Sequence, residues 1–145
     1  VDDELDGDGL DLITGAPPFM PLGSGILPKD PQRAAGRFEL LGGVEDYYLT
    51  ASRNLTPNGV VVVLMDGHGA QRNLEAARGS GLHPQRRIDV LPRPGHPATY
   101  SICVAGRSPA ELMASEISMR GPSGDLWTPE YAAIRQHLDL PGGID

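Results

Sequence analysis

The chain has 145 residues, 39% hydrophobic and 21% charged, which suffices for one folded domain with its core but not for two. Its formal net charge of -7 excludes nucleic-acid binding by overall positive charge, so any RNA contact must use local clusters of basic residues. The single cysteine, Cys103, excludes an internal disulfide and a cysteine-rich zinc site, and the 4 histidines lack ligand spacing, so we expect no metal.

The sequence contains no apolar stretch near the roughly 18 residues that a membrane-spanning helix needs. Its first residues, VDDELDGDG, are acidic, whereas a secretion signal begins with basic residues. We therefore expect a cytoplasmic protein without membrane contact. An acidic, flexible lead-in (residues 1–9) is expected to precede one domain (residues 10–140).

The first half of this domain predicts a strand, a loop, two helices and a buried strand. Leu10–Thr14 is apolar and predicts a short strand, after which prolines at positions 17, 18, 21, 28 and 31 indicate a long functional loop. Apolar residues then recur at spacings of three and four up to Leu55, which predicts two helices separated by Gly42-Gly43. Thr56-Pro57-Asn58-Gly59 is typical of a turn, and the unbroken run Val60–Met65 predicts a strand buried on both faces.

The second half predicts a helix over Gln71–Arg78 and strands over Arg86–Leu91, Thr99–Ala105 and Glu116–Arg120. A last helix is expected to begin at Thr128-Pro129-Glu130, because threonine caps helices and proline is favoured in their first turn. Strands that alternate with helices indicate an α/β fold.

The stretch Asp66-Gly67-His68-Gly69 lies between a predicted strand and a predicted helix, where dinucleotide-binding proteins carry a glycine fingerprint. The third glycine of that fingerprint is absent, since Arg72 occupies its place. Asp89, the acid that could bind a ribose, falls inside a strand pattern. We therefore interpret the stretch as a glycine turn.

The segment Leu10 to Phe19 (LDLITGAPPF) carries the most specific motif of the chain. It resembles S-adenosylmethionine (SAM)-dependent methyltransferases that modify exocyclic amines of bases or glutamine amides, in which an aliphatic strand ends in Asn/Asp-Pro-Pro-aromatic. More narrowly, residues 17–24, 32–39, 42–47 and 127–131 are similar to bacterial enzymes that methylate the adenine amine next to the anticodon of a valine tRNA. The likeness runs from Leu10 to Leu138.

The resemblance implies a fold class and a cofactor. The fold would be the C-terminal half of a Rossmann-like methyltransferase sheet, with parallel strands, one antiparallel strand and helices on the faces. SAM would lie near Thr14 and Gly15. Such enzymes hold SAM mainly with elements upstream of the Pro-Pro motif, and only about ten residues precede it here. We therefore expect a fragment or truncated relative that is inactive alone, whose Leu10–Thr14 strand is a sheet edge open to the missing N-terminal half or to another chain.

The resemblance also implies roles for four catalytic positions. The first motif residue and the next carbonyl accept the two amine hydrogens, and the aromatic ring stacks on a flipped-out base. Here Pro17 would supply the carbonyl, Pro18 a rigid spacer and Phe19 the stacking ring. Ala16 departs from the motif, since it replaces Asn or Asp and removes one acceptor.

Three functions stay open at this stage. The first is methyl transfer to an adenine amine in tRNA or other RNA, that is, RNA modification or tRNA processing. The second is a non-catalytic interaction or RNA-docking module, and in both cases Lys29, Arg33 and Arg37 are the expected RNA-binding residues. The third is half of a small-molecule methyltransferase, in which Ala16 enlarges the pocket for another substrate.

Overall fold

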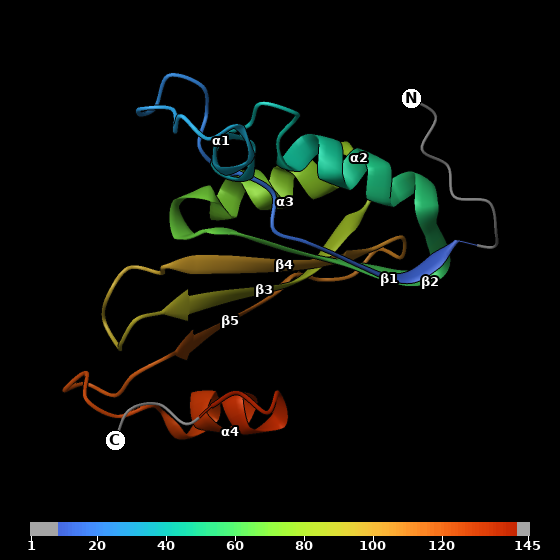
Figure 1. Cartoon of the computed structure of the whole chain (residues 1–145). Helices are drawn as coiled ribbons and strands as arrows, with labels where there is room; N and C mark the ends of the chain where they lie inside the picture. Colours follow the sequence, from blue (N-terminus) through green and yellow to red (C-terminus); the bar gives the residue numbers. More distant parts are fainter. Residues whose placement is uncertain (1–8, 142–145) are drawn as a thin grey trace.

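The computed structural model describes residues 9–141, which form a mixed five-stranded sheet with helices (Figure 1). The strands are β1 (Leu10–Gly15), β2 (Leu55–Asp66), β3 (His83–Leu91), β4 (Tyr100–Gly106) and β5 (Met113–Ser118). The helices are α1 (Pro31–Arg37), α2 (Val44–Asn54), the short 3₁₀ helix η1 (Gly67–Gly69), α3 (Ala70–Gly79) and α4 (Pro129–His137). The α/β fold expected from the sequence is confirmed.

The strand order is β1-β2-β4-β3-β5. β1 is parallel to β2, and β3 is parallel to β5, while β4 pairs antiparallel with both β2 and β3. β4 is thus the one antiparallel strand of this sheet, as expected from the methyltransferase resemblance. β1 lies at an edge of the sheet, which confirms the prediction for Leu10–Thr14.

The core lies between the sheet and helices α2 and α3. Val61, Val63 and Met65 of β2 are about 1% exposed, and they belong to the same buried cluster as Tyr48 of α2 and Leu74 of α3. The alternate residues of β2 point to the opposite face and are only half-buried. The prediction that β2 is buried on both faces is therefore wrong, because α2 and α3 cover one face only.

Further boundaries differ from the sequence prediction, and β3 begins at His83 and not at Arg86. Residues 56–59 do not turn the chain but belong to β2, where they form an irregularity: Leu10 pairs with Leu55, and Leu12 pairs with Val60. At Gly59 a Cβ atom would lie 2.8 Å from the Leu10 carbonyl oxygen, so this close approach requires glycine. β5 begins and ends earlier than expected, because its pairing with β3 runs from Met113 to Ser118.

The predicted helices are present, but α1 ends at Arg37, before the expected break at Gly42-Gly43, because Phe38 leaves the helix and pairs with Met20. Gly42, with φ of 120°, and Gly43 separate α1 from α2, and the Thr128 hydroxyl accepts the Tyr131 amide at 3.2 Å as the cap of α4. Apart from Gly9, the expected lead-in lies outside the described residues. No helix within residues 9–141 is long and apolar enough to cross a membrane.

Candidate active site

The loops that could form a site gather where β1, β2, β3 and β5 end, which we call the carboxyl edge of the sheet. β1, β2, β3 and β5 run in the same direction, so the segments that follow them leave the sheet at the same end. Figure 1 shows α1 and the loops after β3 and β5 at this end, and the start of β1 at the other. The carboxyl ends of parallel strands are where open α/β sheets bind their ligands.

The Pro-Pro-Phe turn continues directly from β1 at this edge. Pro17 is less than 2% exposed, whereas the Phe19 side chain is 39% exposed. No donor within residues 9–141 bonds to the Pro17 carbonyl. The whole Pro17 residue, its carbonyl included, is therefore buried and anchors the turn, and the Phe19 ring is the accessible part.

A short backbone pairing fixes the far end of this turn. The Met20 amide donates to the Arg37 carbonyl at 3.2 Å, and the Glu39 amide donates to the Met20 carbonyl at 3.1 Å. Met20 and Phe38 form an isolated parallel bridge, and Phe38 is 1% exposed. The turn is thus held between β1 on one side and the segment after α1 on the other.

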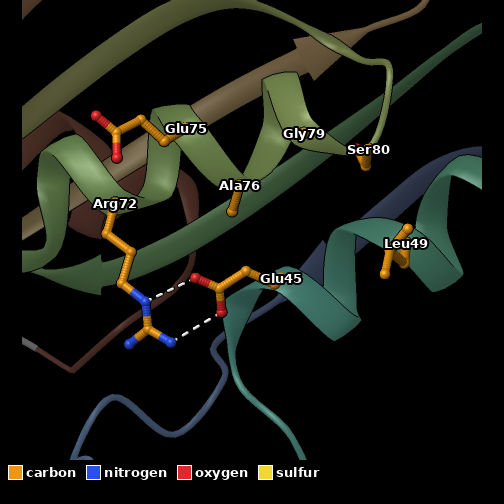
Figure 2. Close-up of a pocket in the computed structure, with 7 residues that line it drawn as sticks. All are labelled: Glu45, Leu49, Arg72, Glu75, Ala76, Gly79 and Ser80. Carbon is orange, nitrogen blue, oxygen red and sulfur yellow. Dashed lines mark hydrogen bonds and ion pairs between the residues drawn. The ribbon is translucent and has the colours of Figure 1, made fainter.

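Arg72 connects that segment to α3. Its Nη1 lies 2.5 Å from Glu39 Oε1, and its Nε and Nη2 each lie 2.8 Å from the Glu45 carboxylate (Figure 2). The hydrogen bond from Arg72 holds the pKa of Glu45 below its ordinary value. Gly43 makes room for this contact, since a Cβ atom there would lie 2.8 Å from Arg72 Nη2. We call Arg72, Glu39 and Glu45 the arginine clamp.

The arginine clamp borders a groove of about 280 Å³ between α2 and α3. Figure 2 shows its lining residues, with Leu49 and Ala76 as the apolar part between the two helices. The sequence suggested no role for Glu39 or Glu45. For Arg72 the sequence indicated only that it replaces the third glycine of the fingerprint. Its contact with Glu39 joins residues 33 positions apart and therefore leaves no local sequence pattern.

A second hollow, of about 380 Å³, lies on the face of the sheet opposite α2 and α3. Thr14, Gly15 and Ala16 line it together with aliphatic side chains of β2 and β4, namely Val62, Leu64 and Ile102. The structure therefore brings the two predicted cofactor residues and the first catalytic position together. The lining residues of this hollow include no charged side chain that could pair with the charged groups of SAM.

The glycine stretch after β2 is a turn, as the sequence interpretation favoured. The Asp66 carboxylate accepts the Gly69 amide at 2.9 Å and caps η1, and a Cβ atom on Gly67 would collide with the Ala98 carbonyl. Asp89 lies within β3, where it accepts hydrogen bonds from Arg87 and Ser101. Burial raises the pKa of Asp89, but these two hydrogen bonds outweigh it and hold that pKa below its ordinary value. The Asp89 carboxylate is thus occupied by hydrogen bonds from Arg87 and Ser101 within the sheet.

The three predicted RNA-binding residues are exposed at or beside α1. Arg33 and Arg37 are four positions apart and share a face of the helix, and Lys29 precedes the Asp30 cap. None of them forms an ion pair with a carboxylate of residues 9–141. Among the same residues, no group of three or more His, Cys, Asp or Glu side chains could hold a metal ion.

Comparison with solved structures supports the fold. A predicted O-methyltransferase from Agrobacterium tumefaciens superposes with a TM-score of 0.58 at 22% identity, covering 64% of this chain and 45% of its own. The crystal structure of an M1.HpyAVI–SAM complex matches at 8% identity over 91% of this chain and 78% of its own, with a TM-score of 0.42 that is too low to establish a shared fold. No protein-family model and no curated protein sequence matches the chain.

The first of these comparisons establishes a methyltransferase-like α/β fold for this chain. The chain spans 45% of the length of that neighbour, so the fold is shared over less than half of it.

Proposed function

We propose that this chain is the substrate-presenting half of a SAM-dependent methyltransferase that modifies an exocyclic amine of adenine in RNA, with tRNA as the favoured substrate. The turn Ala16 to Phe19 carries this proposal, because it presents the accessible Phe19 ring at the carboxyl edge of the sheet. Beside it lies the Pro17 carbonyl, which receives no hydrogen bond within residues 9–141 and which a small movement of the turn must uncover for a substrate. The motif resemblance and the methyltransferase-like fold support the same function.

In this proposal each residue of the turn has a physical task. The Pro17 carbonyl accepts one hydrogen of the amine, which orients the nitrogen lone pair outward. Phe19 stacks on a base that has left its helix, and Pro18 keeps ring and carbonyl at a fixed separation. SAM supplies an electrophilic methyl group when it is bound, with Thr14 and Gly15 on one wall of its site.

Ala16 leaves the second amine hydrogen without an acceptor in this turn. By analogy with a removed oxyanion-hole donor, such a loss costs about 2.7–4 kcal/mol of transition-state stabilisation. We infer that the part of the methyltransferase fold that this chain does not span supplies the second acceptor together with most of the SAM site. On its own the chain should bind SAM too weakly to detect.

Calorimetry and a transfer assay test this proposal. Titration of SAM into the chain should give no binding heat, and tight binding would contradict the half-site. A protein that joins this chain to a SAM-binding half-domain, which we call the joined protein, should transfer labelled methyl groups from SAM to unmodified tRNA. Phe19→Ala should reduce transfer about tenfold or more, since stacking of one base contributes about 1–3 kcal/mol. The control Leu22→Ala changes another exposed apolar side chain of the same loop, and an equal loss there would refute the stacking role.

Ala16 also favours a second candidate function, a non-catalytic RNA-docking module. In that case the joined protein would bind RNA without transferring methyl groups. Reversing the charges of Lys29, Arg33 and Arg37 would weaken binding in a salt-dependent way. Methyl transfer to RNA would exclude this candidate, and methyl transfer to small acceptors alone would favour the third option of a small-molecule enzyme.

A further inference from the structure

The carboxyl edge of the sheet carries a second group of basic side chains, far from α1. Arg93 lies in the loop after β3, Arg120 follows β5, and Arg135 belongs to α4. The guanidinium groups of Arg120 and Arg135 lie 3.9 Å and 4.8 Å from the centre of the Trp127 ring. The Arg93 guanidinium reaches the same place, since its Nη1 lies 3.4 Å from where a Cβ atom of Gly124 would be.

These contacts converge on a small hairpin after β5. Arg120 Nη1 donates to the carbonyls of Gly124 and Asp125 at 3.3 Å and 2.9 Å, and Arg135 donates to the Pro141 carbonyl. The turn at Gly124 needs glycine because its φ is 84°. We call Arg93, Arg120 and Arg135 the arginine cluster.

The charges of the arginine cluster are not compensated. None of its members forms an ion pair with a carboxylate of residues 9–141, although the sequence has 19 acidic against 12 basic residues. The nearest acids along the chain are Asp89, Glu116 and Asp139, each four residues from one of the three arginines. Asp89 is already bonded to Arg87 and Ser101, and Glu116 and Asp139 are exposed. Three guanidinium groups gathered without a counter-charge repel one another, which is a cost that a bound anion would relieve.

The geometry favours a phosphate over a base. Guanidinium groups cover the Trp127 ring, so its face is occupied, whereas their outer N–H groups can donate to phosphate oxygens in pairs. The arginine cluster stands after β3 and β5, three and four strand positions from β1. At about 4.8 Å per strand this is about 14–19 Å from the Pro-Pro-Phe turn, a distance that a short RNA segment can span.

We propose that the arginine cluster binds backbone phosphates of the same RNA whose adenine the Pro-Pro-Phe turn receives. This inference rests on the proposed function for the identity of the RNA. Lys29, Arg33 and Arg37 lie beside the Pro-Pro-Phe turn, at the opposite end of the carboxyl edge from the arginine cluster. The RNA strand would therefore be held at both ends of this edge, and the acidic remainder of the protein surface would repel it elsewhere.

Trp127 provides a direct test, because it is the only tryptophan of the chain and two members of the cluster contact its ring. Titration with a dodecameric single-stranded RNA should change Trp127 fluorescence, and inorganic phosphate at matched phosphate concentration should not. An equal response to inorganic phosphate would assign the cluster to small anions and overturn the proposal.

Replacing all three arginines with glutamine should weaken RNA binding about tenfold and reduce the slope of log affinity against log salt by about 2, at about 0.7 per lost phosphate contact. Arg93→Gln alone keeps the hairpin hydrogen bonds, and its salt slope should fall by about 0.7, a third of the change expected for the triple variant. Arg53→Gln removes an exposed arginine at the opposite edge and is the matched control.

An unchanged salt slope in both Arg93→Gln and the triple variant would overturn the proposal. The assay needs neither SAM nor methyl transfer, so its failure is distinct from failure of the proposed function. RNA binding through the cluster without any methyl transfer by the joined protein would leave this inference standing and refute the enzyme.

Discussion

The arginine clamp should control the order of the Pro-Pro-Phe turn, and Arg72→Gln tests this. Arg72 holds Glu39, and the Glu39 amide in turn bonds to the Met20 carbonyl directly after the turn. Removing the guanidinium leaves the Glu39 carboxylate, only 16% exposed, without its ion-pair partner. The turn should then keep β1 and the Met20 backbone hydrogen bonds, but the segment that shares them loses its link to α3.

The magnitude follows from the exposure of each ion pair. The Glu45 side chain is 49% exposed, so solvent screens its pair with Arg72, which contributes about 0.5 kcal/mol. The pair with the less exposed Glu39 is a charge-assisted hydrogen bond and contributes about 1.5 kcal/mol. We expect Arg72→Gln to lower the free energy of unfolding by about 2 kcal/mol in urea denaturation.

Hydrogen exchange supplies the local measurement. If the clamp holds the bridge between Met20 and Glu39, their amides should exchange about tenfold faster in Arg72→Gln through local opening. Core amides such as that of Val63, which exchange by global unfolding, should accelerate about thirtyfold, as a loss of about 2 kcal/mol requires. Arg78→Gln, an exposed change on the same helix, should alter neither. Bridge amides that keep their native exchange rates in Arg72→Gln would refute the reasoning, because the lost ion pairs would then not reach the turn.

Three further predictions concern single side chains. Tyr48 is 0% exposed and its hydroxyl donates to Asn73 Oδ1 at 2.9 Å, so Tyr48→Phe should cost about 2 kcal/mol in urea unfolding, whereas Tyr47→Phe at a 43% exposed position should cost nothing measurable. The pKa of Glu45 is lowered by its hydrogen bond with the clamp arginine, so its stabilising effect is present above its ordinary pKa of 4.5 and is lost as the pH falls through the lower folded value. The stability gap between the native chain and Glu45→Gln should therefore close below pH 4.5, and a gap that persists there would contradict an ionic origin. Ala16→Asn should restore the missing amine acceptor and raise kcat of the joined protein about tenfold or more. Ala16→Leu is the control, since leucine is similar in size to asparagine but has no acceptor. Equal kcat values for the two variants would show that the side chain at this position only fills space.

Short-range patterns determined much of this protein. The valine run of β2, the cap at Thr128 and the glycines between α1 and α2 each produce their structure through neighbours a few residues away. The Pro-Pro-Phe turn belongs to this class as well, because proline fixes its own backbone angle wherever the chain places it. For these elements the sequence suffices to predict type and approximate boundaries.

Contacts between distant positions decided the rest. Val62 and Leu64 follow the same apolar pattern as their buried neighbours, yet only the position of α2 and α3 determines that their face is the uncovered one. Likewise, residues 56–59 have turn composition, but pairing with β1 keeps them in β2.

The two arginine groups illustrate the same physical reason. Arg72 contacts a glutamate 33 positions away, and Arg93 and Arg120 meet at one hairpin although 27 positions separate them. An arginine carries no local signal of its partner, since its long side chain can reach an acid, a carbonyl or an aromatic ring with similar ease. Only the folded sheet, by ordering its strands β1-β2-β4-β3-β5, brings the Pro-Pro-Phe turn and the arginine cluster to one edge.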